Sequence, residues 1–209
     1  MITIIDYGVG NLFSLKSSLE AIGQPVTISN QPETIRQGQR IILPGVGAFG
    51  DAAQKLRRSG LDQVLLEEAD KGKPLLGICL GMQLLFDTSS EYGLHTGLGL
   101  IRGQVQPISS VIPPDLKVPH MGWNALHFPT DQEKHPLFNY TNDGDCVYFV
   151  HSYYAAPWGP ALIAFSEYGA ALTAAVARRN ICGCQFHPEK SGLVGLNILR
   201  AFCEMGEDL

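Results

Sequence analysis

The chain has 209 residues, enough for one domain with a sizeable hydrophobic core. Its 45% hydrophobic and 17% charged residues are ordinary for a soluble globular protein, and its net charge of -5 argues against nucleic acid as the main partner. An odd number of cysteines, five, and the lack of a basic leader before the first apolar run predict a reducing compartment, so we expect a cytoplasmic protein. That first run is far too short to span a membrane.

The first half of the chain alternates short apolar runs with helical periodicity. The pattern predicts strands over residues 2–6, 26–29, 40–43 and 75–78, and helices after Asn11 and over 61–69 and 82–86. Asn11 suits the N-cap of the first helix, and Gly23 suits its end. Strands that alternate with helices predict a parallel sheet covered on both faces.

The second half has a different character, with loops rich in Pro, Gly and Asn. Strands are predicted over 98–106, 118–128, 146–154, 162–168 and 181–186, followed by a closing helix over 193–203. We expect a mixed sheet with antiparallel pairs in this part. Because no repeat, linker or low-complexity tract divides the sequence, a single α/β domain over 1–209 is predicted.

A cysteine stands at the apex of the segment Gly77-Ile78-Cys79-Leu80-Gly81. The order of strand, sharp turn and helix matches the nucleophile elbow, with sulfur in place of oxygen. Such a turn forces its apex residue into a strained conformation, and glycines two positions to either side relieve the crowding. The alternative is a buried structural cysteine, since free cysteine is among the most buried residue types.

A cysteine nucleophile needs a base and a group that orients the base. Among six histidines, His187 ends an apolar strand and is followed by Pro188-Glu189. Proline keeps the preceding residue extended, and residues two apart in an extended segment point the same way. Glu189 is therefore predicted to accept the imidazole N–H of His187. The alternative is a surface turn, which would be preferred if the elbow cysteine were absent.

Two further cysteines lie just upstream, in Cys182-Gly183-Cys184. Strand alternation puts both on the face of Phe186, whereas Gln185 shares the face of His187. Two cysteines and one restrained histidine also fall short of a closed zinc set. We therefore interpret both cysteines as small core residues and expect no metal.

An acyl-transfer site also needs donors for an oxyanion. The backbone N–H of Leu80, directly after the nucleophile, is one candidate. The loop Pro44-Gly45-Val46-Gly47, which follows the strand over 40–43, is the second, because its glycines let a peptide turn its N–H toward a bound carbonyl. A phosphate-binding loop or an ordinary turn are the alternatives, but the full nucleotide motifs are missing.

Together these segments resemble the class I (triad) glutamine amidotransferases, in their order and spacing, over nearly the whole chain. The resemblance implies a flavodoxin-like fold in which Cys79 attacks the side-chain amide of glutamine. His187, oriented by Glu189, would protonate the departing ammonia and then activate the water that hydrolyses the thioester. It also implies that Gln83, Ser152 and Tyr153 hold glutamine, that Gly47 and Leu80 are the oxyanion donors, and that the Val46 peptide switches the oxyanion hole. No cofactor is expected.

Further segments resemble the glutaminase subunits of imidazole glycerol phosphate synthases: 6–12, 119–124, 149–153 and Lys190-Ser191. This resemblance implies a heterodimer with a separate (β/α)₈-barrel cyclase subunit, which uses the ammonia to make imidazole glycerol phosphate and aminoimidazole carboxamide ribotide for histidine biosynthesis. The chain is expected to carry no fused synthase domain. Asn11, Trp123, Tyr148 and Lys190 match positions near the interface, although Trp123 and Tyr148 also suit ordinary core or strand positions.

Three other functions remain open at this point. A stand-alone cysteine hydrolase or peptidase would not need the segment 119–124 and should cleave amides other than that of glutamine. A glutaminase could also serve another synthase, such as the pyridoxal phosphate system, which has a barrel partner too. A non-catalytic binding module is disfavoured by the intact set of Cys79, His187 and Glu189.

Overall fold

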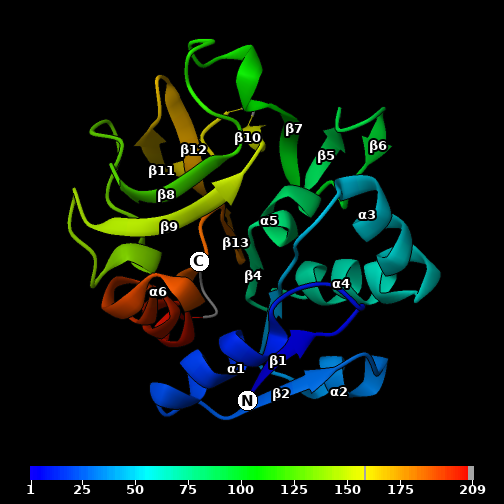
Figure 1. Ribbon diagram of the computed structural model, residues 1–209. Coiled ribbons are helices and arrows are strands. Elements are labelled where there is room, and N and C mark those ends of the chain that lie inside the picture. Colours follow the sequence, from blue (N-terminus) through cyan, green and yellow to red (C-terminus); the bar gives the residue numbers. More distant parts are fainter. Residues whose placement is uncertain (158, 207–209) are drawn as a thin grey trace.

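The computed structural model describes residues 1–157 and 159–206. A central sheet of seven strands contains β1 (Ile2–Ile5), β2 (Val26–Ser29), β3 (Arg40–Leu43), β4 (Leu75–Ile78), β11 (Leu162–Glu167), β12 (Ala171–Arg178) and β13 (Ile181–Cys184). Their spatial order is β11-β12-β13-β4-β3-β1-β2 (Figure 1). The strands from β13 to β2 are parallel, whereas β11 and β12 are antiparallel additions at one edge. The predicted mixed sheet is thus confirmed.

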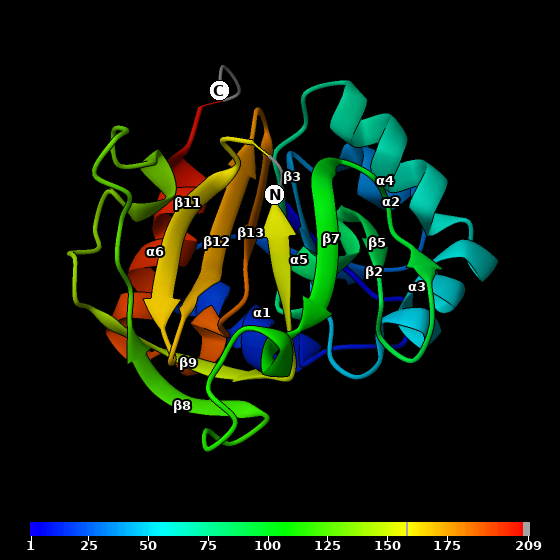
Figure 2. The same ribbon diagram turned by 90° about the horizontal axis from the view of Figure 1, so that it is seen from above.

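Two smaller sheets are built from the middle of the chain. One has the order β10-β7-β5-β6, formed by β5 (Phe86–Ser89), β6 (His95–Thr96), β7 (Ile101–Pro107) and β10 (Tyr153–Pro157). The other is a two-stranded antiparallel ribbon of β8 (His120–Ala125) and β9 (Cys146–His151). Viewed from above, β10 (yellow) lies between β7 (green) and the central sheet, where it contacts β12 (Figure 2).

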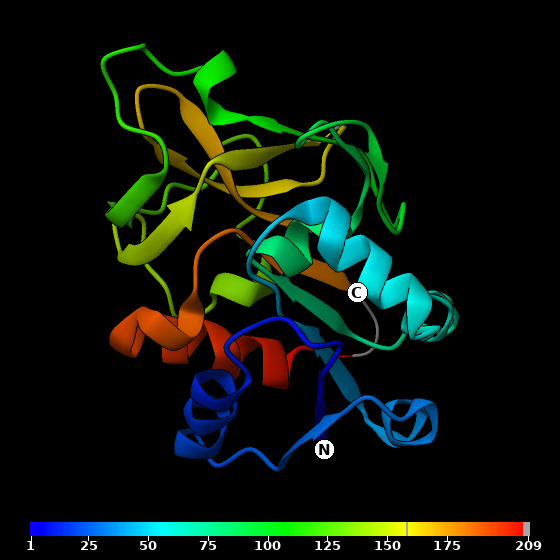
Figure 3. The same cartoon turned by 45° about the vertical axis from the view of Figure 1, so that its right-hand side comes forward.

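Helices cover both faces of the central sheet: α1 (Leu12–Ala21), α2 (Pro32–Gln37), α3 (Phe49–Arg58), α4 (Leu61–Asp70), α5 (Leu80–Leu84) and α6 (Gly192–Glu204). Alternate residues of β3 separate the two cores, with Ile41 in the cluster of α2 to α5 and Ile42 in the cluster of α1 and α6. Figure 3 shows α1 (blue) beside α6 (orange to red), with α3 (cyan) on the other side. Among the described residues, none of the helices is long and apolar enough to cross a membrane.

Asn11 occupies the N-cap of α1, as predicted, although its side chain makes no capping hydrogen bond. Several other predicted boundaries were wrong. The helix expected over 82–86 begins at Leu80 and ends at Leu84, because Phe86 already belongs to β5. The strand expected over 146–154 is two strands that separate at Ser152 and enter different sheets. Among the α-helices and β-strands of the described residues, five were not predicted: α2, α3, β5, β6 and β12.

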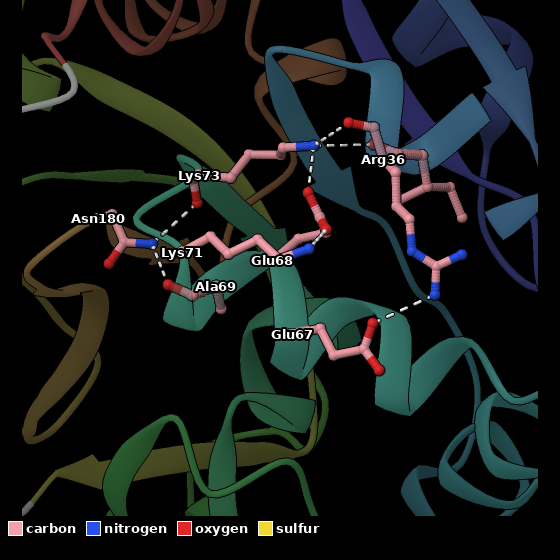
Figure 4. Close-up of polar contacts among 8 residues, drawn as sticks. Arg36, Glu67, Glu68, Ala69, Lys71, Lys73 and Asn180 are labelled. Atoms are coloured by element: carbon pink, nitrogen blue, oxygen red, sulfur yellow. Dashed lines mark hydrogen bonds and ion pairs between the residues drawn. The ribbon is translucent and has the colours of Figure 1, made fainter. Parts of the chain in front are cut away.

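A cluster of charged and amide side chains fixes the end of the sheet where β4 begins (Figure 4). Glu68, whose side chain is 3% exposed, forms ion pairs with Lys71 at 2.6 Å and with Lys73 at 2.5 Å. Lys73 also donates to the carbonyl oxygens of Ile35 and Arg36, which ties α4 and β4 to the end of α2. Asn180 donates to two carbonyls of the α4–β4 connection, at 2.9 and 2.8 Å.

Glu68→Gln should destabilise the fold by about 3 kcal/mol, because it removes the carboxylate that pairs with the largely buried Lys73 ammonium. Burial alone would raise the pKa of Glu68, but hydrogen bonds from Lys71 and Lys73 outweigh burial and lower it. The contribution of Glu68 to stability is therefore fully present above its unfolded-state pKa of about 4.3 and is lost as the pH falls through its folded-state pKa. Urea unfolding from pH 7 to pH 3 measures both effects.

The neighbouring residue supplies a matched control. Glu67 pairs with Arg36 at 3.2 Å, but its side chain is 53% exposed. An exposed pair contributes at most about 1 kcal/mol. Glu67→Gln should therefore leave the unfolding midpoint nearly unchanged, and equal losses in the two variants would show that burial of Glu68 is not what matters.

Candidate active site

The turn between β4 and α5 has the geometry of a nucleophile elbow. Cys79 at its apex has φ 54° and ψ -111°, a strained conformation for a residue with a side chain. A Cβ added to Gly81 would lie 1.8 Å from the carbonyl oxygen of Leu43, and one added to Gly77 would lie 2.7 Å from the Gly81 carbonyl oxygen. Both glycines are thus required by close backbone approach, as the elbow pattern predicts.

His187 lies at the end of the segment that continues β13. Its Nδ1 is 2.8 Å from Oε1 of Glu189, and the two side chains are only 3% and 4% exposed. The backbone fixes the histidine further, since its N–H donates to the Tyr148 carbonyl at 3.0 Å and its carbonyl accepts from Oγ of Ser191 at 2.6 Å. The predicted contact between His187 and Glu189 is therefore present.

The protonation of His187 is set by competing effects. Burial lowers the pKa of His187, but its interactions with Cys79 and Glu189 outweigh burial and raise this pKa to about 9. Within the described residues, the buried Nε2 atom has no hydrogen-bond partner. The imidazole is thus cationic at neutral pH and has a free donor on the side away from Glu189.

The order of the sheet explains why these residues meet. β13, β4 and β3 are consecutive parallel neighbours, so the segments after their carboxyl ends lie together. Those segments carry His187, Cys79 and the loop that begins at Pro44. A pocket of about 310 Å³ opens there, lined by Val46, Gly47, Cys79, Leu80, Gln83, Glu91, Pro119, Val150, His151, Ser152, Tyr153 and His187.

The proposed oxyanion donors are near the nucleophile, but one of them is in use. The backbone N–H of Leu80, the first candidate donor, donates to the Gly45 carbonyl at 3.3 Å. Gly47 has φ +98° and Val46 is 46% exposed, so the loop projects into the pocket. Its base is held by Tyr7, whose buried hydroxyl donates to the Pro44 carbonyl at 2.8 Å.

The three residues expected to hold glutamine all line this pocket. Gln83 is 5% exposed, and its Nε2 donates to the Tyr153 carbonyl at 3.1 Å. Ser152 lies at the break between β9 and β10, where its own carbonyl accepts from the Ile108 N–H at 3.0 Å.

Sequence reasoning missed three residues of this site. Gln185 is fully buried and donates from Nε2 to Sγ of Cys79 at 3.6 Å. Its position on the face of His187 was the available signal. Glu91 and His151 also line the pocket. Burial lowers the pKa of His151 to about 4, a backbone hydrogen bond to Tyr153 partly offsets this, and the nearby His120 and His187 add to the lowering.

Three of the four residues expected at a partner interface lie together: Trp123, Tyr148 and Lys190. Trp123 is 56% exposed and packs edge-to-face on Tyr148, with ring centroids 6.0 Å apart. The ammonium of Lys190 lies 5.8 Å from the Tyr148 ring. α1, which Asn11 precedes, contacts the turn that contains Lys190. Trp123 is therefore a surface residue and not part of the core.

Comparison with known proteins agrees with this geometry. The family model described as "Glutamine amidotransferase class-I" matches residues 3–204. The chain belongs to the class I glutamine amidotransferase family. Solved structures that share its fold include a glutamine amidotransferase crystal structure, with a TM-score of 0.75, 17% identity and 98% of each chain covered. Another is PurLQS from Thermotoga maritima, with a TM-score of 0.74, 19% identity and coverage of 97% of this chain and 96% of that one.

Relatives of higher sequence identity narrow the assignment within this family. The imidazole glycerol phosphate synthase subunit HisH of Bacillus velezensis is 47% identical over 100% of this chain and 98% of its own length. The protein of the same name from Oceanobacillus iheyensis is also 47% identical, over 98% of this chain and 99% of its own length. These matches place this glutamine amidotransferase in the HisH branch of the family.

Proposed function

We propose that this amidotransferase hydrolyses glutamine to glutamate and ammonia and passes the ammonia to a separate cyclase subunit, as part of an imidazole glycerol phosphate synthase in histidine biosynthesis. The observation that carries the proposal is the meeting of Cys79 and His187 in one pocket, with Glu189 2.8 Å from the far side of the imidazole. This arrangement of nucleophile, base and orienter is the one that acyl transfer requires.

In the first step, Sγ of Cys79 attacks the side-chain carbonyl carbon of glutamine. The carbonyl oxygen becomes an oxyanion that needs backbone donors, and each such donor contributes about 2.7–4 kcal/mol. Because the Leu80 N–H donates to the Gly45 carbonyl, that contact must open before the N–H can serve the oxyanion. A shift of the loop at Val46 and Gly47 would release Leu80 and bring in the second donor.

In the second step, the C–N bond breaks and the nitrogen leaves as ammonia. Since the pKa of His187 is raised to about 9, the imidazole is protonated at neutral pH and can give its Nε2 proton to the departing nitrogen. The neutral imidazole then takes a proton from water, which attacks the γ-glutamyl thioester and releases glutamate. Glu189 stabilises the imidazolium throughout.

The pocket also offers groups for the rest of the substrate. Both hydrogens of the Gln83 amide are used inside the protein, so its Oε1 remains as an acceptor for substrate N–H groups. The carboxylate of Glu91, on the pocket wall, suits an α-ammonium group. The peptides of Ser152 and Tyr153 line the same wall and can contact the rest of the amino acid.

A partner is expected because free ammonia would be protonated and lost in bulk water. We assign this role to the (β/α)₈ cyclase subunit that the HisH-like segments imply. The exposed group of Trp123, Tyr148 and Lys190 supports a docking face, and Met121, at 60% exposure, adds to the apolar area on the same ribbon. A large apolar group on an outward surface is typical of an interaction site.

Glutamine hydrolysis by the isolated chain should be slow and should rise at least about tenfold in the presence of the cyclase subunit and its nucleotide ligand. The physical reason is the blocked Leu80 donor, because the loss of one oxyanion donor costs about 10²–10³ in kcat. The measurement is the rate of glutamate release by the chain alone, by the chain with the cyclase subunit, and by the chain with the cyclase subunit and its nucleotide ligand. Full activity of the isolated chain would contradict the coupling to the partner, and no glutaminase activity under any condition would contradict the function itself.

A further inference from the structure

Gln185 stands beside the nucleophile but has no part in the mechanism described so far. Its side chain is fully buried, and its backbone N–H donates to the Ala174 carbonyl at 2.8 Å, which anchors it to β12. Its Oε1 accepts from Nε2 of Gln83 at 2.9 Å, and its Nε2 donates to Sγ of Cys79 at 3.6 Å. It is therefore in contact with one residue that attacks glutamine and one that binds it.

The Tyr153 carbonyl fixes which amide atoms donate and which accept in this series of hydrogen bonds. The Tyr153 carbonyl can only accept, so the Gln83 amide must turn its Nε2 toward that carbonyl, at 3.1 Å. The second hydrogen on the same nitrogen then points at Gln185, which must present its oxygen. The remaining end of the Gln185 amide is its NH₂ group, and this faces the sulfur of Cys79.

The main-chain carbonyl that begins this chain is itself fixed. Nδ1 of His151 donates to the same Tyr153 oxygen at 2.8 Å, so two side-chain donors converge on it. His151 is in turn 3.0 Å from the buried His120 on the neighbouring strand β8. Because the amide of Gln83 cannot flip without placing its oxygen against the Tyr153 carbonyl, the amide of Gln185 cannot flip either.

We propose that Gln185 is a positioning residue for glutamine hydrolysis. Its Oε1 locks the amide of Gln83 so that the Gln83 oxygen faces the substrate, and its Nε2–H group holds the sulfur of Cys79 in place and stabilises the negative charge of the attacking thiolate. The inference rests on the proposed glutaminase function, but its contact with the sulfur also predicts a chemical property that requires no substrate.

Two variants separate the two ends of the amide. Gln185→Glu keeps an oxygen acceptor for Gln83 but replaces the N–H donor beside Cys79 with an anionic oxygen. Gln185→Met introduces a side chain of similar length that can neither accept the hydrogen bond from Gln83 nor donate one to Cys79. If the proposal holds, the Glu variant lowers kcat and the alkylation rate by iodoacetamide by about tenfold each, with KM within about twofold of wild type. The Met variant lowers both rates and raises KM by about tenfold as well.

Cys182→Ala serves as the matched control. Cys182 is also fully buried on β13, but its side chain lies in the core on the opposite face of the strand. Its loss should lower the thermal midpoint without changing KM or the alkylation rate of Cys79. General destabilisation cannot explain a result in which both Gln185 variants slow alkylation but only Gln185→Met raises KM.

Alkylation of Cys79 by iodoacetamide is measured on the complex with the cyclase subunit in the absence of glutamine. Because this reaction needs no substrate, it tests the inference separately from the proposed function. If the wild type fails to hydrolyse glutamine, the function is wrong, whereas the sulfur contact is still tested by alkylation. If both variants alkylate within twofold of wild type, Gln185 does not position Cys79. If the Glu variant raises KM as much as the Met variant does, Gln185 does not orient Gln83. Should the Met variant not fold, alkylation of the Glu variant decides the first of these points.

Discussion

Cys79→Ala should abolish glutamine hydrolysis, with a fall in kcat of at least about 10⁴-fold. The variant removes the only atom that forms the bond to the substrate, so neither His187 nor the oxyanion donors can compensate. Synthesis that uses added ammonia should persist in the complex with the cyclase, because the ammonia then bypasses this pocket. Glutamate release and ammonia-dependent product formation, measured on the same preparation, separate the two reactions.

Stability should barely change in this variant, since alanine adopts the strained φ of 54° no more easily than cysteine does. Cys146→Ala is a suitable control for loss of a thiol, because Cys146 is exposed and the one hydrogen bond of its Sγ within the described part of the chain is donated to the Gly144 carbonyl, at 3.8 Å. It should leave glutaminase activity intact. Glutaminase activity retained by Cys79→Ala would refute the nucleophile assignment, and loss of ammonia-dependent synthesis would point to damage at the interface.

Much of the fold is predictable from local pattern because β2, β3 and β4 are short runs of strand-forming residues, and their observed bounds match the expected ones. β12 was missed because four of its eight residues are alanine, which is a weak signal for strand formation. α3 was missed even though Phe49, Ala52, Ala53 and Leu56 are buried at helical spacing. A count of apolar residues at helical spacing over this segment would have predicted α3.

Some features of the candidate site are encoded in short local segments, whereas others depend on contacts between distant segments. The elbow at Cys79 and the contact between His187 and Glu189 are encoded within a few residues each, so their geometry could be predicted. The contact of Gln185 with Cys79 depends on β13 pairing with β4, and the position of Glu91 depends on a loop after β5. Strand alternation puts Gln185 on the face of His187, but neither contact can be predicted from local sequence, since each arises only when separate segments are placed side by side.

Gly81→Ala should be the most damaging single-methyl change near the site, with a loss of more than about 3 kcal/mol in the free energy of unfolding. The added Cβ would lie 1.8 Å from the carbonyl oxygen of Leu43 and 2.8 Å from its carbon. These are backbone atoms of a central strand, so no side-chain rotation can relieve the overlap. To accommodate the methyl, α5 would have to move away from β3, and Cys79 at its N-cap would move with it. Urea unfolding followed by circular dichroism measures the loss.

Gly72→Ala separates this overlap from the general cost of replacing a glycine. Gly72 has φ +87°, and a Cβ added there meets no atom within 4 Å, so its variant carries backbone strain alone, about 1–2 kcal/mol. Gly81 is not in the left-handed region, so its predicted loss comes from the close approach of two backbones. A Gly81→Ala protein that unfolds at the same urea concentration as Gly72→Ala would mean that the elbow tolerates a wider spacing. The contact between α5 and β3 would then not be what fixes the position of the nucleophile.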